Sequence, residues 1–371
     1  MIRLKFNCDR NELFEVISNV SRAVSPKSTL AALEGILLRA QSGRLYLSGY
    51  DLDMGMSASI EANVAEEGEI VLTAKLFVDM IRRMAGERVS IESDEKLLTE
   101  IKCGLTEFTI LGIPSEEFPE LPAVTGDEGF SLPQNMLKSM IDQTLFAIAT
   151  NDTKPVHTGS LFEMDGNELS VVSVDGFRLA LRREKLAGAG EASFVVPGKT
   201  LSEISKLLDG ESDELVEVSH SRKHIIFQVS GYAVVSRLLE GEFLDYKAAI
   251  PPAEGTVVTV SKRALIESVE RTSLLISDRL KSPLRVKFDG ECIKMSCSTA
   301  IGKAYDELTC KIEGPPMEMG FNNRYLLDAL RASDCDEVRL VINGPLSPMK
   351  MLPPDGENFL FLVLPVRLKA E

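Results

Sequence analysis

The sequence predicts an α+β protein made of three tandem copies of one domain. Three kinds of landmark recur at intervals of 123 to 128 residues: a helix-start residue (Lys75, Lys199 and Asn323), a hairpin glycine (Gly43, Gly166 and Gly290) and a helical leucine (Leu13, Leu137 and Leu265). They recur in one order and at nearly one spacing, so we interpret them as a repeat. A period this long indicates three small domains, because the units of a solenoid are shorter.

Within each copy the pattern predicts strand, helix and several strands, and then the same order again. In the second copy a short strand leads to Pro133 at a helix start, where a missing N–H does no harm. Alternating strands follow around an Asp165–Gly166 turn, and a strand at 193–197 leads into a second helix that ends near Asp209–Gly210. Three further strands close the copy. The tight turns and the scarcity of βαβ crossovers favour antiparallel sheets.

Two turn-rich joints of similar form, Glu117–Glu120 and Glu242–Asp245, each followed by proline, separate the copies. We therefore expect domains at 1–124, 125–252 and 253–371. Each is long enough to bury a core of its own.

The bulk composition is that of a globular protein, with 44% hydrophobic and 26% charged residues. The N-terminal residues lack the apolar segment of a signal peptide, and the longest apolar run, 359–365, has the length of a strand. Six scattered cysteines without a CxxC pair favour reduced thiols over a disulfide framework. We expect a cytoplasmic protein.

The charge is unevenly distributed along the chain. The net charge is −15, yet the six predicted helices (9–22, 75–84, 133–144, 199–209, 261–272 and 323–332) together hold 13 Lys/Arg and 10 Asp/Glu. The helices are thus mildly basic in an acidic chain. Either they face a polyanion or they hold more basic residues by chance; composition alone leaves both open.

Little in the sequence favours an enzyme. There is no P-loop or GxGxxG motif to hold phosphates. His220 and His224 lie at a predicted turn, so they would not share a helical face, and no third metal ligand is near. His157 has no Ser or Cys partner, and Asp51 and Asp53 fit a strand-end turn. We predict no catalytic residue, no metal and no cofactor.

Several motifs together resemble one family. VDGFRLA (174–180), GFNNRYLLDAL (320–330), the two joints and LPVRL (364–368) are similar to the bacterial sliding clamps, the β subunits of DNA polymerase III. The resemblance covers essentially the whole chain. It implies a non-catalytic homodimer, paired head to tail into a ring, with helices lining the hole and antiparallel sheets outside.

That ring would encircle duplex DNA without sequence specificity and act as a processivity factor of replication. By the resemblance its partners are the polymerase III α subunit and other polymerases, an ATP-driven clamp loader, and repair and ligation proteins. A non-replicative clamp paralogue or an interaction scaffold stays open as the alternative.

The ring interpretation requires two copies. Helices pack about 8–10 Å apart, so six would enclose a hole of roughly 10 Å, too narrow for a duplex. Twelve helices would enclose roughly 25–28 Å, which admits a duplex and a layer of water.

The resemblance also implies a pocket between the second and third domains for short hydrophobic motifs of partner proteins. Its lining would be His157, Val174, Gly176, Phe177, Arg178, Leu179, Leu244, Ala249, Asn322, Tyr325, Leu346, Leu362, Leu364, Pro365, Val366 and Arg367. Apolar side chains would give affinity and Arg178 would orient the peptide. The alternative is that Asp175–Gly176 is only a hairpin turn and 359–366 only a core strand.

The chain departs from the family pattern at three places near this pocket. His157 stands where an aliphatic residue is usual, which could make the pocket polar or pH-sensitive. Ala248 stands where some members have arginine. The tail Lys369–Glu371 extends beyond the usual terminus, and we expect it to hang free rather than cover the pocket mouth.

Two further surfaces follow from the resemblance. The predicted DNA-facing residues are Lys27, Lys75, Arg82, Arg83, Lys138, Asn151, Lys199, Lys206, Lys262, Arg263 and Arg324. The predicted ring seam joins Phe108 of one subunit to Leu275 and Ile276 of the other. The alternatives are ordinary solvated side chains for the first set and ordinary core residues for the second.

Overall fold

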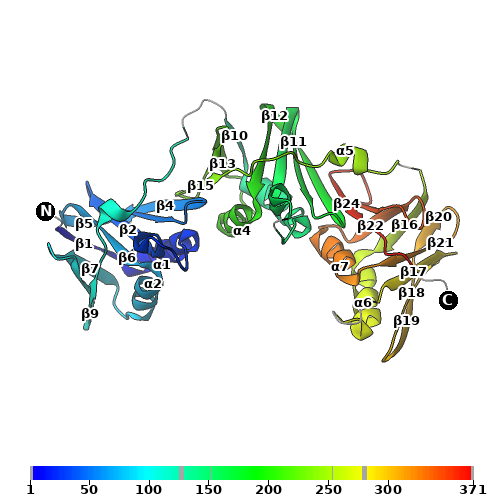
Figure 1. Ribbon diagram of the computed structural model, residues 1–371, viewed down its shortest axis with the longest axis horizontal. Coiled ribbons are helices and arrows are strands. Elements are labelled where there is room, and N and C mark those ends of the chain that lie inside the picture. The colour runs from blue at the N-terminus through cyan, green and yellow to red at the C-terminus, as the bar shows by residue number, and fades with distance from the viewer. Residues whose placement is uncertain (1–2, 125–128, 152, 253, 278–281, 369–371) are drawn as a thin grey trace. The chain divides into compact units, whose positions relative to one another are not determined.

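The computed structural model describes residues 3–124, 129–151, 153–252, 254–277 and 282–368 (Figure 1). It divides into two compact units: unit 1 is Met1–Asn135 with Lys206–Leu238, and unit 2 is Met136–Ser205 with Leu239–Glu371. Both units take residues from the second predicted domain, so the boundaries at 124 and 252 stay predictions. The predicted free tail, Lys369–Glu371, lies outside the described residues.

Unit 1 contains two sheets whose strands pair antiparallel. Five strands make the first sheet, in the order β5 (Asn63–Glu66), β1 (Leu4–Asp9), β7 (Arg88–Ser93), β8 (Leu98–Cys103) and β9 (Thr106–Leu111). Eight strands make the second, in the order β10 (Gly129–Pro133), β13 (Leu215–His220), β14 (His224–Val229), β15 (Tyr232–Arg237), β4 (Met54–Glu61), β3 (Arg44–Tyr50), β2 (Gly35–Gln41) and β6 (Gly68–Thr73).

Unit 2 repeats this plan with two more antiparallel sheets. Seven strands make the larger one, in the order β11 (Gly159–Val174), β12 (Arg178–Pro197), β24 (Phe359–Val363), β23 (Met349–Leu352), β22 (Glu337–Ile342), β16 (Thr256–Ser261) and β20 (Lys311–Glu313). Four strands make the smaller one, in the order β19 (Gly302–Thr309), β18 (Cys292–Thr299), β17 (Leu284–Asp289) and β21 (Met317–Phe321).

The six predicted helices are confirmed to within a few residues. They are α1 (Arg10–Val20), α2 (Ala74–Arg83), α3 (Gln134–Asp142), α4 (Gly198–Leu207), α6 (Lys262–Thr272) and α7 (Asn323–Ala332). A short helix in the second joint, α5 (Tyr246–Ala249), was not predicted. Four residues are too few to show a helical period in the sequence.

Apolar spacing explains why the long helices form and which face they bury. In α2 the buried residues include Ala74, Phe77 and Ile81, three and four positions apart, while Arg82 and Arg83 are exposed. In α1 the Asp9 carboxylate accepts the amide N–H groups of the first turn and so caps the helix.

The predicted turns around the recurring glycines are confirmed. Gly43, Gly166 and Gly290 have φ of 76°, 66° and 66°, a region that favours glycine. In β11 the Ser160 Oγ lies 2.7 Å from the Ser173 Oγ. Ser160 and Ser173 lie on either side of Gly166, so β11 folds back on itself there, as the predicted Asp165–Gly166 turn requires.

The core of unit 2 is built largely from aromatic and branched side chains. Phe288, Phe321, Phe359 and Phe361 are buried in one cluster with Leu330. All six cysteines are free thiols, three of them buried. Among the described residues no helix is both long enough and apolar enough to cross a membrane.

Candidate functional site

A tight turn between β11 and β12 positions the residues of the VDGFRLA motif. The Asp175 Oδ1 accepts the backbone N–H of Phe177 at 2.8 Å and that of Arg178 at 3.0 Å. Gly176 has φ of +90° and open space around its Cα. The positive φ favours glycine at the second position of the turn, and the turn directs Phe177 outward and Arg178 inward.

Arg178 is held on four sides by its own chain. Its Nε donates to Asp175 at 2.9 Å and its Nη1 to Asp328 of α7 at 2.5 Å. Its guanidinium carbon lies 4.6 Å from the ring centroid of Tyr325 and 5.5 Å from that of Phe146. The side chain is 9% exposed. It joins β12 to α7 and fixes the position of the turn; its role in binding a peptide stays a prediction.

The predicted pocket residues separate into a buried layer and an exposed layer. Val174, Leu179 and Leu362 are buried together in one apolar cluster. The exposed apolar members of the predicted set are Phe177, Leu244, Leu346, Leu364 and Val366. Ala249 and Arg367 are also exposed and Pro365 is half-buried. The first three residues form a buried supporting layer in this structure, and contact of either layer with a ligand stays a prediction.

Aromatic stacking and a helix cap organise the α7 side of this surface. The Phe177 ring, 58% exposed, stacks on Tyr325 with centroids 5.9 Å apart. Asn322, predicted to line the pocket, caps α7 by accepting the Arg324 N–H at 3.0 Å. Its side-chain oxygen is therefore already used by the helix.

His157 lies against the joint that leads to α5. Its ring is 5.2 Å from the Phe243 ring, edge to face. Burial, and then the nearby Lys154 ammonium, lower the pKa of His157 below its ordinary value. The neutral ring is favoured, so the residue acts more as an apolar surface than as a charge. Ala248 is exposed on α5 and its N–H donates to Asp245 at 3.3 Å.

Several predicted DNA-facing side chains are engaged within the protein. The Lys138 Nζ donates to the Ser205 carbonyl oxygen at 2.7 Å, and the Lys262 Nζ to the Ser333 carbonyl oxygen at 2.9 Å. Ser333 is the C-cap of α7, where a cation offsets the unpaired carbonyls. These ammonium groups stabilise helix ends as well as adding positive charge.

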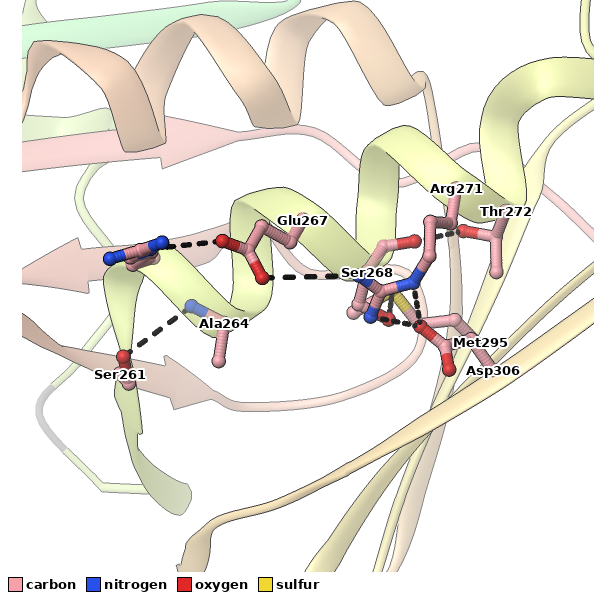
Figure 2. Close-up of polar contacts among 9 residues, drawn as sticks. Ser261, Ala264, Glu267, Ser268, Arg271, Thr272, Met295 and Asp306 are labelled. Atoms are coloured by element: carbon pink, nitrogen blue, oxygen red, sulfur yellow. Dashed lines mark hydrogen bonds and ion pairs between the residues drawn. The ribbon is translucent and has the colours of Figure 1, made fainter.

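Acidic neighbours offset the arginines of α6 (Figure 2). Ser261 caps the helix, Arg263 pairs with Glu267 at 2.9 Å, and Arg271 pairs with Asp306 at 2.7 Å. On α2, Arg82 pairs with Asp79 at 2.5 Å. Surface pairs of this kind are weak and can exchange with other anions.

The remaining members of the predicted DNA set are exposed. They are Lys27, Lys75, Arg83, Asn151, Lys199, Lys206 and Arg324. Lys27 lies between two short 3₁₀ helices, in a loop where its carbonyl oxygen accepts the Ser25 hydroxyl at 2.9 Å. A backbone held in this way presents the ammonium to solvent.

The predicted seam residues lie on or beside edge strands. Phe108 is on β9, the edge of the five-stranded sheet, and is half-buried. Leu275 and Ile276, also half-buried, adjoin the turn of β18 and β19, since a Cβ at Gly302 would lie 3.6 Å from Leu275. β19 is the edge of the four-stranded sheet.

The most exposed apolar residues of the same two edges were not among the predicted seam residues. Beside Leu275 these are Leu274, Ile301 and Tyr305, and beside Phe108 they are Leu105 and Leu111. The alternation of AYDELT and EFTIL was a usable signal, because it places Tyr305 and Leu111 on the exposed face of an edge strand, opposite half-buried residues such as Leu308 and Ile110.

A groove of about 1260 Å³ lies in unit 1, away from the VDGFRLA turn. It runs over β13, β15, β4, β3 and β2, next to the first joint. Its exposed acids are Glu116, Glu120 and Glu217. Within the described ranges no three His, Cys, Asp or Glu residues are grouped as metal ligands.

Comparisons with known proteins give one consistent result. Residues 4–122, 131–245 and 247–367 match the N-terminal, central and C-terminal domain models of the DNA polymerase III beta subunit. The chain is 31% identical over 377 residues to a beta sliding clamp of Bacillus subtilis, covering 98% of this chain and 100% of that protein.

Solved structures agree with the family models. A putative DNA polymerase III beta subunit from Eubacterium rectale superimposes with a TM-score of 0.94 at 34% identity, covering 98% of this chain and 100% of that one. The DNA polymerase sliding clamp of Bacillus subtilis superimposes with a TM-score of 0.95 at 30% identity, covering 99% and 100%.

Replacing Arg178 with alanine should destabilise unit 2 by about 2–3 kcal/mol, because Asp175 and Asp328 would lose their common cation and the Asp175 side chain is only 13% exposed. Arg178→Lys should restore little, since an ammonium cannot make both bonds and stack between two rings. Urea unfolding, monitored by circular dichroism, measures the decrease in the free energy of unfolding.

The matched control is Arg263→Ala, which removes an arginine–carboxylate pair whose arginine side chain is 89% exposed. This substitution should lower the free energy of unfolding by only a small fraction of the decrease caused by Arg178→Ala. Equal losses in the two variants would contradict the bridging role of Arg178.

His157 should make folding stability depend on pH. Its pKa is lower in the folded protein than in the unfolded chain, so the stabilising contribution is present above about pH 6.5 and is lost as the pH falls through the folded value. His157→Gln should flatten this part of the profile. An NMR titration of the His157 ring measures its pKa directly. A ring that titrates at or above about pH 6.5 contradicts the prediction.

Proposed function

Because the chain belongs to the family of DNA polymerase III β subunits, the β sliding clamps, we propose that two copies of it close head to tail into a ring around duplex DNA. Its function is that of a sliding clamp, a non-catalytic processivity factor of DNA replication. One observation carries this conclusion: three successive domain models of that family match residues 4–122, 131–245 and 247–367.

The charge distribution supports a lining that attracts DNA without gripping it. The six long helices are the mildly basic part of a chain with net charge −15, and several of their cations are already bonded internally. Phosphate contacts are not sequence-specific and exchange readily in salt, so a weak basic lining lets a ring slide. The acidic remainder repels DNA from other surfaces.

The exposed apolar surface beside the VDGFRLA turn is proposed to take short hydrophobic motifs of polymerases, the clamp loader and repair and ligation proteins. Phe177, Leu346 and Leu364 would contact the motif, and Arg178 would hold the supporting layer. An exposed apolar group on a fixed scaffold is what such a peptide needs. With these partners, the proposed location is the cytoplasm, with the chromosome.

The ring seam is proposed to join the β9 edge of one copy to the β19 edge of its partner. Each edge has unpaired backbone groups and exposed apolar side chains, and an isolated edge of this kind favours strand addition. The two edges differ in sequence, which fits a head-to-tail contact.

Charged substitutions at the seam should produce folded monomers. Leu275→Asp combined with Ile301→Asp would bury two carboxylates in the contact, so we expect a species near 40.7 kDa in sedimentation, where the wild type sediments as a dimer. The matched control is Leu30→Asp with Leu215→Asp, two exposed leucines elsewhere. A seam variant that stays dimeric would contradict the assignment.

Topology gives the direct test of function. The protein is loaded on nicked circular plasmid with a bacterial clamp loader and ATP, washed at high salt, and half of the sample is then linearised. High salt removes ordinary phosphate contacts, so a closed ring should stay on circles and leave linear DNA. Retention is read by gel filtration and immunoblot.

Loss from both forms of DNA, with a loader proven on its own clamp, would refute ring closure. The protein would then fit the alternative of a clamp paralogue or scaffold that binds partners without encircling DNA. The seam double variant is the matched negative control, because a monomer cannot be retained on circles.

A further inference from the structure

The turn that presents the proposed peptide surface of unit 2 occurs a second time, in unit 1. Asp51 Oδ1 accepts the N–H of Asp53 at 3.0 Å and that of Met54 at 2.7 Å. Leu52, at the centre of the turn, has φ of +79°. The Asp175 carboxylate holds its own turn in the same way, with Gly176 at φ of +90°.

The strands that follow also correspond. The Arg237 N–H donates to the Asp53 carbonyl oxygen at 2.8 Å, and the Leu364 N–H donates to the Phe177 carbonyl oxygen at 2.9 Å. β15 pairs with β4 as β24 pairs with β12. Arg237 therefore occupies the position of the exposed Leu364, and Asp53 that of Phe177.

A neighbouring turn completes the correspondence. Residues 221–223 join β13 to β14, as the loop containing Leu346 joins β22 to β23. The loop of unit 1 carries Arg222 and Lys223 instead. The Leu238 N–H donates to the Lys223 carbonyl oxygen at 2.8 Å, and His224 is the cross-strand partner of Arg237. The three cations thus lie on adjacent turns and strands.

These cations are available to a ligand. Arg222, Lys223 and Arg237 are exposed, and none of them forms an ion pair with another described residue. Leu52 is 51% exposed beside them. The same turn holds two acids, the half-buried Asp51 and the exposed Asp53, so the three cations leave an excess of one positive charge.

We propose that this basic patch (Leu52, Arg222, Lys223 and Arg237) binds a short acidic segment of a partner protein, with an apolar residue of that segment on Leu52. The inference rests on the proposed peptide surface of unit 2, whose scaffold it shares. Guanidinium groups bind carboxylates through two parallel hydrogen bonds, which favours this ligand chemistry.

Charge and composition favour an acidic peptide over the alternatives. The chain as a whole has a net charge of −15 and repels acidic segments. A local basic patch therefore determines where an acidic segment can bind. Single-stranded nucleic acid needs exposed aromatic rings for its bases, and Tyr50, the aromatic residue next to the Asp51 turn, is only 7% exposed.

The test uses the full-length protein and fluorescent probes of equal length. The first is a peptide of Asp and Glu with one central Leu, the second a Leu/Phe-rich peptide, and the third duplex DNA. Anisotropy is measured for wild type, for the patch variant R222E/K223E/R237E, and for R44E/R88E/K96E, a matched change of net charge on other exposed cations of unit 1. The patch variant should bind the acidic peptide at least about tenfold more weakly than wild type, and the control variant should not.

Each outcome decides one question. Equal loss in both charge variants, or no binding of the acidic peptide to wild type, overturns the inference. If the binding of duplex DNA depends on the patch and the binding of the acidic peptide does not, the inference is also overturned. The patch is then a phosphate contact. The hydrophobic peptide reports separately on unit 2: its failure to bind wild type counts against the proposed peptide surface, whatever the acidic peptide does.

Discussion

One carboxylate that accepts two consecutive backbone N–H groups is the constraint on which both candidate binding surfaces depend. Asp175 and Asp51 each close a tight turn whose second residue has a positive φ. The turn ends one strand and begins the next, so it fixes which strand pairs beside it. The third residue then points to solvent, free to vary. This explains how one scaffold holds Phe177 in unit 2 and Asp53 in unit 1, with different ligand chemistry.

Hydrogen bonds from basic side chains connect neighbouring helices within each unit. Arg10 donates to the Arg82 carbonyl oxygen at 2.6 Å, and Lys262 donates to that of Ser333 at 2.9 Å. A cation at the start of one helix thus satisfies a carbonyl at the end of the next. These charges hold helix pairs together first. A neutral carbonyl does not cancel the charge of its donor, so these side chains are held at the helix ends and keep their positive charge.

The sequence pattern predicted the features that depend on residues close together in the chain. The six helices and the turn glycines follow from spacing and backbone conformation that a sequence displays directly. The sequence did not predict that Asp328, 150 residues from Arg178, would hold its guanidinium, because that contact exists only after the sheets have formed. Nor did it predict that Val174 would be buried while Phe177, three residues later, would be exposed, because apolar character alone does not distinguish the two.

The edge strands are the strongest physical reason for a closed assembly. β9 and β19 each leave backbone groups unpaired and apolar side chains in water, a combination that invites uncontrolled strand addition. Two unlike edges that pair with each other give a heterologous contact, which either repeats without end or closes. By the spacing of packed helices, twelve would surround a duplex and six would not, so the proposed closure at two copies would satisfy both the edges and the size of the hole.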